Sequence, residues 1–329
     1  MHAIRLHSFG PPENLRLEEL PDLTPAPGQV RIAVEASGVH LLDTTIRRGE
    51  PGPLPPPELP TVPGREVAGV VDRLGPDTDP AWLGGRVVAH LGPVPGGYAD
   101  QAVTAEQNLF RVPDHVTFPE AVAAVGTGRT ALGVVELEPA TSGDVVLVLS
   151  AAGGLGWLLV QSALAAGARV VAAAGGSRTG ALADLAAEAA AMTIADYADP
   201  GWATQVEQEL GGVTLAYDGV GGDIGRAALE LLRPGGRLVM FGFSAGTPTP
   251  VTTDDLVRRG ISAGWSLGPR MAALPGGIPG LAGRALDRVA TGEWRPLVST
   301  FPLAEAGRAH AELEGRNALG KVVLVSDRQ

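Results

Sequence analysis

The stretch Ser150-Ala-Ala-Gly-Gly-Leu-Gly156 follows the apolar run 145–149 and precedes a segment with helical character, 157–166. A strand, a glycine-rich turn and a helix in this order predict a phosphate site, because backbone N–H groups at a helix N-terminus bind anions. The turn reads A-x-G-x-x-G, with Ala151 at the usual first glycine. Gly153 would allow a pyrophosphate to approach, and Gly156 would allow the helix to pack closely on the strand.

A second strand after the turn strengthens this interpretation. The chain holds 46 glycines, so a single glycine cluster is more often a plain turn. Here the run 168–174 arrives where a βαβ unit needs its second strand. We therefore expect a dinucleotide site whose phosphate-binding turn comprises Ala152, Gly153, Gly154 and Leu155.

The end of the second strand indicates which dinucleotide is bound. An acidic residue there would accept hydrogen bonds from the ribose 2′-hydroxyl of NAD, but the chain has Gly175-Gly-Ser-Arg178, and its first carboxylate after the strand is Asp184. Ser177 and Arg178 offer a hydroxyl and a guanidinium that suit a 2′-phosphate. The sequence favours NADPH (NADP) over NADH, the alternative being that Arg178 is an ordinary surface arginine.

Two domains are expected for 329 residues, and the texture of the sequence changes near residue 120. Earlier segments are short and alternating, as in 29–35, 67–74 and 86–91, which predicts a small antiparallel barrel. From Phe118 onward helices alternate with apolar strands, which predicts a doubly wound parallel sheet and an α/β fold. We expect further strands at 215–217, 237–241, 261–267 and 321–325, and loops at 51–63 and 269–280.

Composition excludes several classes of protein. The net charge of −11 argues against a nucleic-acid partner, and the absence of cysteine excludes disulfides and thiolate metal sites. The uncharged run 145–168 is interrupted by glycines, so a buried strand and helix explain it better than a membrane span. Because 1–5 lacks the features of a signal peptide, we expect a cytoplasmic protein.

Five motifs in order resemble a known family. They are Ser37–Gly49, Pro63–Val71, the turn 150–156, Asp218–Gly221 and Gly320–Leu324. Together they resemble the zinc-free quinone oxidoreductase branch of the medium-chain dehydrogenase/reductases. The resemblance implies a Rossmann nucleotide-binding domain, 121–267, inserted in a GroES-like β-barrel catalytic domain, 1–120 plus 268–329.

The residues themselves argue against zinc. Zinc-dependent relatives have a cysteine where this chain has His40, and a histidine where it has Arg65 in Gly64-Arg65-Glu66. Arginine stays protonated and cannot ligate a metal, so His40 and Glu66 are an incomplete ligand set. We expect no metal and activity that survives chelation.

Without a metal, the expected chemistry is hydride transfer from NADPH to a quinone, because the reduced product is an oxyanion that solvent can protonate. An alcohol or aldehyde substrate would usually require a Lewis acid. One alternative is an NADPH-dependent enoyl, alkenal or enone reductase. Another is a protein that binds the cofactor without catalysis.

Motif matches to the family imply the remaining site residues. They place His40, Asp43 and Arg47 at the substrate mouth, although Asp43 could instead cap a helix beginning at Thr44. The family often has a tyrosine where this chain has Thr45, so no role is carried over for that ring and a more open pocket is expected. Cofactor contacts are implied for Thr130 and 241–244 near the nicotinamide, and for Tyr197 and Arg316 near the 2′-phosphate. The full set of expected cofactor residues is Thr130, Ala152, Gly153, Gly154, Leu155, Gly175, Ser177, Arg178, Tyr197, Val220, Phe241, Gly242, Phe243 and Arg316.

The segment 260–267 predicts how the protein assembles. As the outermost strand it would leave Ile261, Trp265 and Leu267 at an open sheet edge, which is an aggregation hazard unless covered. Pairing with a second copy across a twofold axis would cover this edge, so we expect a homodimer with a continuous sheet. The alternative is that 269–280 folds over the edge and leaves a monomer.

Overall fold

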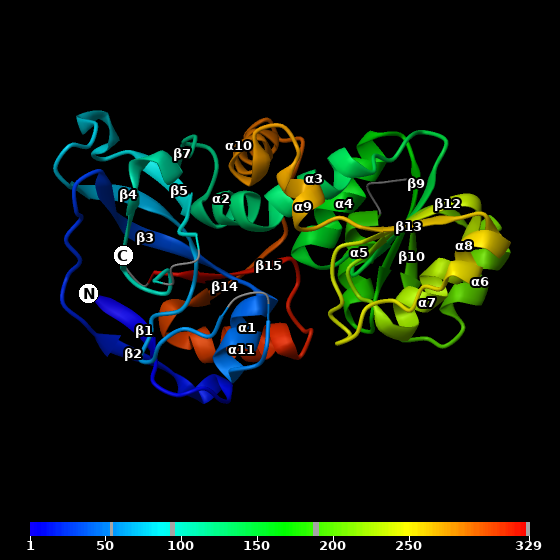
Figure 1. Cartoon of the computed structure of the whole chain (residues 1–329), viewed down its shortest axis with the longest axis horizontal. Helices are drawn as coiled ribbons and strands as arrows, with labels where there is room; N and C mark the ends of the chain where they lie inside the picture. The colour runs from blue at the N-terminus through cyan, green and yellow to red at the C-terminus, as the bar shows by residue number, and fades with distance from the viewer. Residues whose placement is uncertain (53–54, 93–95, 187–190, 327–329) are drawn as a thin grey trace. The chain divides into compact units, whose positions relative to one another are not determined.

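The computed structural model describes residues 1–52, 55–92, 96–186 and 191–326. Contacts between Cα atoms divide the chain into two compact units, one formed by Met1–Arg129 with Ala282–Gln329 and the other by Thr130–Leu281 (Figure 1). The sequence placed the corresponding divisions at 120/121 and 267/268. The first unit is built from both ends of the chain, and the second is one continuous segment.

The first unit contains a seven-stranded sheet that is antiparallel except for its β14–β15 pair. Its strand order is β14-β15-β3-β4-β5-β7, and β6 pairs separately with β3. Every second side chain of β3 is buried along much of its length, which is the alternation that the sequence showed. The strands are β3 (Gln29–Val39), β4 (Glu66–Leu74), β5 (Arg86–His90), β6 (Gln101–Ala105), β7 (Leu109–Arg111), β14 (Val298–Pro302) and β15 (Lys321–Val325).

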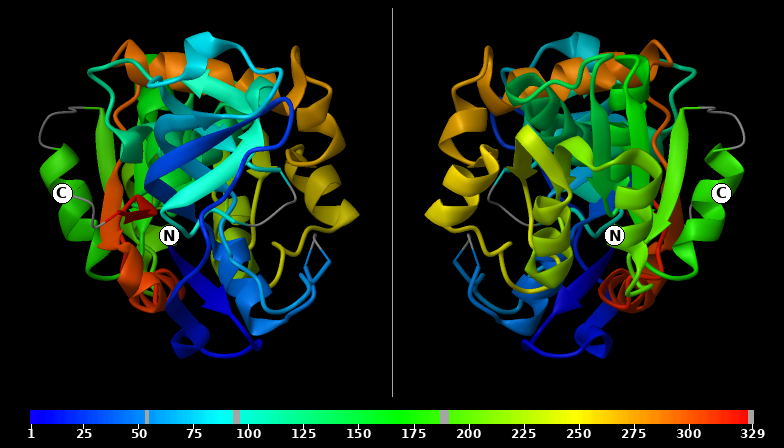
Figure 2. Two further views of the ribbon diagram at one scale, coloured as in Figure 1. Left: turned by 90° about the vertical axis from the view of Figure 1, so that its left-hand side faces the viewer. Right: turned by 90° about the vertical axis from the view of Figure 1, so that its right-hand side faces the viewer.

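The C-terminal strand β15 joins the two ends of the chain in this sheet. It pairs antiparallel with β3, with Val323 opposite Gly38, and parallel with β14 (Figures 1 and 2). Its residues 321–324 are buried. A C-terminal strand is therefore part of the core of the N-terminal half, as the family resemblance implied.

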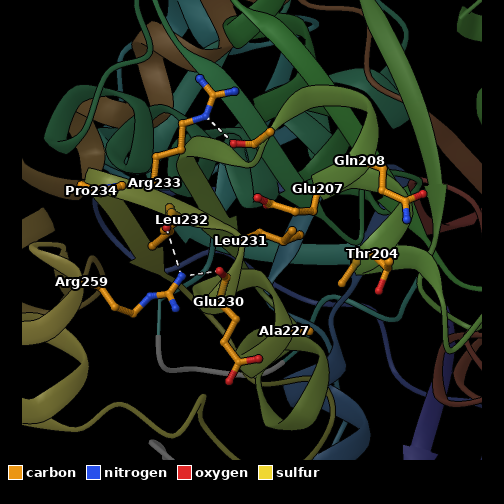
Figure 3. A pocket seen from close by; sticks show the side chains of 12 residues that line it. Thr204, Glu207, Gln208, Ala227, Glu230, Leu231, Leu232, Arg233, Pro234 and Arg259 are labelled. Carbon is orange, nitrogen blue, oxygen red and sulfur yellow. Dashed lines mark hydrogen bonds between the residues drawn. The ribbon is translucent and has the colours of Figure 1, made fainter.

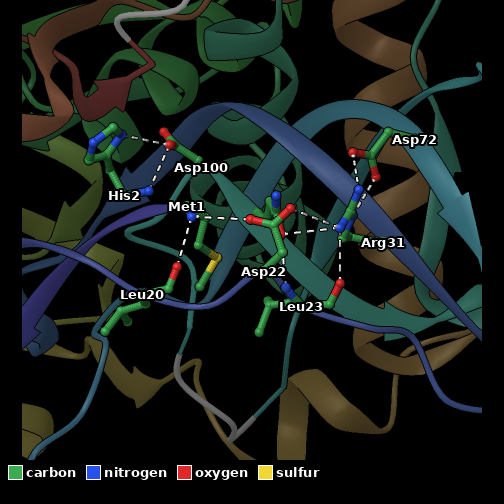
Figure 4. Close-up of polar contacts among 9 residues, drawn as sticks. Met1, His2, Leu20, Asp22, Leu23, Arg31, Asp72 and Asp100 are labelled. Atoms are coloured by element: carbon green, nitrogen blue, oxygen red, sulfur yellow. Dashed lines mark hydrogen bonds and ion pairs between the residues drawn. The ribbon is translucent and has the colours of Figure 1, made fainter.

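A separate hairpin, β1 (His2–Leu6) and β2 (Leu15–Glu19), is tied to the barrel by polar contacts. The N-terminal amine donates to Leu20 O at 2.8 Å and to Asp22 Oδ1 at 3.1 Å, and His2 N donates to Asp100 Oδ2 at 2.8 Å (Figure 4). These bonds fix the start of the chain against strands of the sheet. The α-helices that lie wholly in the described part of this unit are α1 (Leu41–Arg48), α2 (Phe118–Ala123) and α11 (Ala306–Glu314).

The second unit contains a six-stranded parallel sheet with strand order β10-β9-β8-β11-β12-β13. This is the order of a dinucleotide-binding doubly wound fold, so the predicted fold class is confirmed. Its strands are β8 (Val145–Leu149), β9 (Arg169–Ala174), β10 (Met192–Asp196), β11 (Val213–Asp218), β12 (Leu232–Met240) and β13 (Ser262–Trp265).

Helices cover this sheet on both faces. The chain runs from β8 to β9 and β10 in one direction and then crosses to β11, β12 and β13 in the other, and right-handed crossovers in opposite directions place their helices on opposite faces. Figure 1 shows α4 (Gly154–Ala165) and α5 (Arg178–Ala186) on one side of the sheet, with α6 (Trp202–Leu210), α7 (Gly222–Glu230) and α8 (Thr253–Arg259) on the other. The remaining helices are α3 (Arg129–Leu137), α9 (Pro269–Ala272) and α10 (Gly277–Ala290).

One of the two predicted loops is wrong, and the other is confirmed in its described part. The segment 269–280 is not a loop, since it contains α9 and the start of α10. Pro269 and Pro279 both lie in a first helical turn, where the missing N–H has no intrahelical partner anyway. The proline-rich segment 51–63 has no helix or strand in its described part, and residues 53–54 lie outside the described residues.

Candidate functional site

The glycine turn lies at the carboxyl end of β8, the first strand of the parallel sheet. Ser150 adopts a positive φ of 56°, and α4 begins at Gly154 with Gly153 as its N-cap. A Cβ on Gly156 would lie only 2.2 Å from Ser150 O, so glycine is required there for helix–strand packing. At Gly153 a Cβ would lie 3.2 Å from the backbone oxygen and the hydroxyl of Ser150, so a side chain would also be tightly placed there. The turn therefore fits a pyrophosphate at a helix N-terminus.

The structure brings together three residues expected at the 2′-phosphate. The guanidinium of Arg178 donates a 3.2 Å hydrogen bond to the hydroxyl of Tyr197. The ring of Tyr197 would lie 2.8 Å from a Cβ on Gly175, so the glycine makes room for the ring. Ser177 is exposed beside them, at the turn before α5. The group lies at the carboxyl ends of β9 and β10, where ligands of such sheets bind.

Sequence reasoning missed Asp196, the last residue of β10. Its Oδ1 accepts the backbone N–H of Gly176 at 2.8 Å and that of Ala198 at 2.9 Å. The carboxylate fixes the loop that presents Ser177 and Arg178. The signal for it was the acidic residue immediately before Tyr197.

A third loop at the carboxyl ends of the strands is held in place by Asp218, which is fully buried at the end of β11. Its Oδ1 accepts N–H groups of Val220 and Gly221 at 2.8 and 2.9 Å, and its Oδ2 accepts the Thr249 hydroxyl. This side-chain role was not predicted, although the motif 218–221 was recognised. Buried carboxylates that accept several backbone N–H groups fix a loop in one conformation.

The residues that follow β12 lie against this loop. Phe241 N donates to Asp218 O at 2.9 Å, and the Phe241 ring would lie 2.4 Å from a Cβ on Gly219. Phe243 is 46% exposed and its ring centroid lies 6.1 Å from that of Trp265. Val220, Phe241, Gly242 and Phe243 are therefore neighbours at one edge of the sheet. Thr130 is half-buried as the second residue of α3, and its approach to a nicotinamide stays a prediction.

A hollow at the opposite edge of this sheet is not the cofactor site. It lies where β11 and β12 begin, beside the ends of α6 and α7 (Figure 3). Arg233 donates to Gly211 O at 2.8 Å, and Arg259 donates to Leu232 O at 3.1 Å, so both arginines satisfy carbonyls there. Nucleotides bind such sheets at the carboxyl ends of the strands, which this hollow does not adjoin.

The first unit holds a buried polar cluster centred on Glu66, which begins β4. His40 Nε2 lies 2.5 Å from Glu66 Oε1, and Lys321 Nζ lies 3.2 Å from Glu66 Oε2 and 2.7 Å from His40 Nε2. The side chains of Glu66 and Lys321 are 1% and 4% exposed, whereas that of His40 is 29% exposed. His40 is thus the member of this His40–Glu66–Lys321 cluster through which solvent or a ligand has access.

Two glycines make room for the Glu66 carboxylate. A Cβ on Gly38 would lie 2.4 Å from Glu66 Oε2, and a Cβ on Gly126 would lie 2.1 Å from the same atom. Gly126 belongs to a π-helical segment, Ala124–Gly128, and such segments are frequent at functional sites. The backbone is therefore shaped around a buried charge.

The charges of the cluster perturb one another. Burial alone would raise the pKa of Glu66, but the neighbouring His40 and Lys321 outweigh it and hold that pKa well below its ordinary value. Burial lowers the pKa of Lys321, and Glu66 opposes only part of this effect. Burial also lowers the pKa of His90 to about 4, and the positive charge of Arg129 adds to the shift. Strongly perturbed groups in one place mark a candidate functional site.

Asp43 supports His40. The helix α1 begins at Leu41 with His40 as its N-cap, so Asp43 lies in the first turn as the acidic member of a capping box, three residues later than an N-cap. Its Oδ2 accepts the His40 backbone N–H at 2.8 Å and the Tyr98 hydroxyl at 3.2 Å, and the side chain is 4% exposed. Asp43 is therefore a buried, hydrogen-bonded residue beside His40, and its place at the substrate mouth stays a prediction.

Arg47 is buried in the same way, and its place at the substrate mouth also stays a prediction. Its side chain is 1% exposed, one end of its guanidinium lies 2.5 Å from Glu314 Oε1, and the other donates to Gly10 O. These contacts join α1 to α11 and to the loop before β2. Motif matching gave Arg47 its place in the sequence, but the orientation of a side chain within a helix depends on packing.

Arg316 follows α11 in the first unit and adopts a positive φ of 58°. The approach of its side chain to a 2′-phosphate stays a prediction. Glu66, Lys321, His90 and the buried pair Tyr98–His310 were not predicted as site residues. The only signals were polar residues at the start of apolar strands, in Glu66-Val-Ala and Lys321-Val-Val.

The residues of this cluster do not fit zinc. Among the described residues, no group of three or more His, Cys, Asp or Glu side chains could hold a metal ion. The ammonium of Lys321 lies against both His40 and Glu66, and Arg65 lies 3.5 Å from Asp43 as a fixed cation. The Lys321 ammonium beside both His40 and Glu66 disfavours a metal cation at the same place.

No helix in the described parts of the chain is long and apolar enough to cross a membrane. The uncharged run 145–168 consists of β8, the glycine turn and α4, as predicted from its interruptions.

Comparisons with known proteins agree with this architecture. The model of the alcohol dehydrogenase GroES-like domain matches residues 26–114, and that of the zinc-binding dehydrogenase family matches 189–324. A 2-haloacrylate reductase from Burkholderia sp. is 32% identical, and a quinone oxidoreductase from Pseudomonas aeruginosa is 30% identical; each alignment covers 98% of this chain and 98% of the relative. A mycobacterial protein solved with NADPH is 33% identical with a TM-score of 0.84, over 99% of this chain and 100% of the other. The fold, the motifs and these relatives together show that the chain belongs to the quinone oxidoreductase-like branch of the medium-chain dehydrogenase/reductase superfamily.

Proposed function

We propose that the protein is an NADPH-dependent reductase that transfers hydride to a quinone without a metal ion. The observation that carries the cofactor assignment is the contact between Arg178 and Tyr197 beside Gly175, at the carboxyl end of the second strand. An arginine and a hydroxyl there suit a 2′-phosphate. The relative solved with NADPH supports the same cofactor.

When bound, NADPH would supply the hydride. The residues of this chain would bind the cofactor, orient the acceptor and stabilise the negative charge that forms on it. The turn 152–155 would hold the pyrophosphate at the start of α4. Arg178, Ser177 and Tyr197 would hold the 2′-phosphate. His40, the accessible end of the buried cluster, would donate a hydrogen bond to the acceptor oxygen, which gains negative charge during reduction.

An α,β-unsaturated carbonyl compound is the second candidate acceptor. The 2-haloacrylate reductase at 32% identity favours it, because its named substrate carries a carbon–carbon double bond conjugated to a carboxyl group. Quinones and enones place the developing negative charge on a similarly positioned oxygen. The same His40 contact would serve both.

Steady-state oxidation of NADPH, followed by its absorbance, tests the proposal against a panel of quinones, enones and acrylates. Turnover with quinones above the rest supports the first candidate, and turnover confined to enones or acrylates supports the second. Tight NADPH binding with turnover of none of them would contradict both and favour a binding protein without catalysis.

The localisation, the oligomeric state, the partners and the domain limits are proposals as well. We propose a cytoplasmic homodimer that acts on a small molecule and not on nucleic acid or a membrane. We also retain 121–267 as the inserted nucleotide-binding domain and 1–120 plus 268–329 as the catalytic domain. Limited proteolysis tests these limits, because cleavage near 120 and 267 would release them.

A further inference from the structure

Lys321 is the single lysine among the 25 lysine and arginine residues of the chain. Every other basic position that could carry either residue carries arginine. Yet Lys321 is 4% exposed and starts a buried strand, a place where a lysine is seldom found. Arginine cannot lose its proton in a protein, whereas a buried lysine can. The sole lysine therefore stands where an exchangeable proton would matter.

The geometry around His40 Nε2 requires a shared proton. This atom lies 2.5 Å from Glu66 Oε1 and 2.7 Å from Lys321 Nζ. A ring nitrogen carries either one N–H or one lone pair in its plane, so it can donate to Glu66 or accept from Lys321, but not both. Two alternative proton positions at His40 Nε2 would satisfy these two contacts in turn.

The second carboxylate oxygen favours this exchange. Glu66 Oε2 receives no well-aligned hydrogen bond from the described residues, although Lys321 Nζ lies 3.2 Å away. The hydrogen-bonded path therefore runs from Lys321 to His40 and from His40 to Glu66. Both contacts use Nε2, which leaves Nδ1 of the partly exposed ring to pass a proton outward.

The surrounding groups shift the pKa of Lys321 in opposite directions, and the net shift is downward. Burial and the positive charge of Arg129 lower its pKa, whereas Glu66 and Asp43 raise it. The titratable and charged groups around the path come from several elements of the unit and are Glu66, His40, Asp43, Arg65, His90 and Arg129.

We propose that Lys321 is a positioning residue that stores the proton required for reduction and delivers it through His40 to the acceptor. The inference rests on the proposed reductase function and identifies the proton source for it. It goes beyond a fixed counter-charge for Glu66, because it requires Lys321 to lose and regain a proton in each turnover.

The step balances as follows. Hydride from NADPH forms a new C–H bond, and the displaced electron pair of the acceptor moves to its oxygen. That oxygen would take the proton from His40 Nδ1, while His40 Nε2 takes one from Lys321 Nζ and keeps it as an N–H that donates a hydrogen bond to Glu66 Oε1. Lys321 would then be a neutral amine. A proton from solvent at the exposed Nδ1 and return of the Nε2 proton to Lys321 would restore the starting state, so the products would be NADP⁺ and the acceptor with one hydride and one proton added.

The first test reads Lys321 directly in the whole protein. Biosynthetic labelling with ¹³C,¹⁵N-lysine gives one side-chain NMR signal that needs no assignment, since the chain has one lysine. We expect it to titrate at least about one pH unit below an ordinary lysine, and lower still in Glu66→Gln, which removes the stabilising negative charge. A midpoint at or above the ordinary lysine value would overturn the proposal. This measurement needs neither acceptor nor turnover.

The second test uses Lys321→Ala, with kcat measured in a series of small alkylamines of different pKa. We expect kcat to fall roughly 10²-fold or more, NADPH affinity to change less than about twofold, and added amines to restore activity with a rate that follows amine pKa. Rescue that is independent of amine pKa, or kcat unchanged by the substitution, would show that Lys321 is only a counter-charge.

Two further variants distinguish a loss of proton delivery from a folding defect. Lys321→Met combined with Glu66→Gln removes both buried charges, so it should fold while still lacking the pH dependence of kcat. Arg226→Gln breaks a 2.7 Å ion pair with Asp255 in the other unit and should leave the pH profile of kcat unchanged. A double variant with the wild-type profile would contradict the proposal. If none of the tested acceptors supports NADPH oxidation by the wild-type protein, the proposed function is contradicted. The NMR titration would still test the shared proton.

Discussion

The guanidinium of Arg178 and the hydroxyl of Tyr197 lie 3.2 Å apart although they follow different strands, β9 and β10. The strands are parallel, with Ala174 opposite Asp196, so the residues that follow them meet at one sheet edge. The resulting group of Gly175, Arg178 and Tyr197 carries the cofactor assignment.

Arg178→Ala should therefore narrow the preference for NADPH. A charge-assisted phosphate contact contributes about 1.5–3 kcal/mol, so we expect the wild-type protein to bind NADPH at least about tenfold more tightly than NADH. Calorimetric dissociation constants for both cofactors measure the gap. Arg169→Ala, an exposed residue at the amino end of the same strand, is the matched control and should leave the gap intact. Equal affinities in the unmutated protein would sink the assignment.

A pair of glycine substitutions tests the turn. Gly156→Ala should lower the free energy of unfolding by about 1–3 kcal/mol, because the new Cβ would lie 2.2 Å from Ser150 O. Gly180→Ala, in the helix α5 with no atom within 4 Å of its Cβ, should raise it by about 0.5–1 kcal/mol. Denaturant unfolding of both variants checks the opposite signs, and a Gly156→Ala protein as stable as the wild type would contradict the packing role.

Stability should decrease with acid partly because of His310. Burial lowers its folded-state pKa from 6.5 to about 4. Between these two pH values His310 therefore binds a proton in the unfolded chain but not in the folded protein. Relative to its value above pH 6.5, the free energy of unfolding should therefore be lower by roughly 3 kcal/mol once the pH has fallen to about 4.

His310→Phe tests this in denaturant unfolding at a series of pH values. The ring is kept beside Tyr98 but its titration is removed, so the slope of the unfolding free energy between pH 6.5 and 4 should be smaller. The exposed His7→Gln is the control and should keep the wild-type slope. An unchanged slope in His310→Phe would show that His310 titrates normally.

The order of elements was predictable from the sequence, whereas the pairings between distant residues were not. Glycines at 153 and 156 and the apolar runs fixed the expected parallel sheet, and β13 lies at its edge as predicted. Pro269 misled because a proline in a first helical turn looks like a loop signal. Lys321 and His40 are 281 positions apart, so neither periodicity nor motif spacing could indicate their contact. The burial of Arg47 could not be predicted either, because it depends on Glu314, in the helix α11.

The open edge of β13 should mediate a dimer, because an unpaired strand exposes backbone donors and acceptors. Light scattering at micromolar concentration should give twice the chain mass of 33.6 kDa. Adjacent N–H groups of a strand point to opposite sides, so one of Ser262→Pro and Ala263→Pro removes an outward donor and should weaken the dimer. A wild-type mass of one chain would rule this assembly out.

The central claim is metal-free hydride transfer from NADPH to a conjugated acceptor, and isotope tracing after exhaustive chelation tests it most directly. NADPH deuterated at C4 is incubated with the chelated protein and a quinone or an enone, zinc is measured by elemental analysis, and the products are examined by mass spectrometry. The account predicts full turnover with far less than one zinc per chain. It also predicts one deuterium on carbon in the enone product, whereas a hydroquinone loses the label to water if it is bound to oxygen. Turnover that stops on chelation and returns with stoichiometric zinc, or an enone product without deuterium, would contradict it.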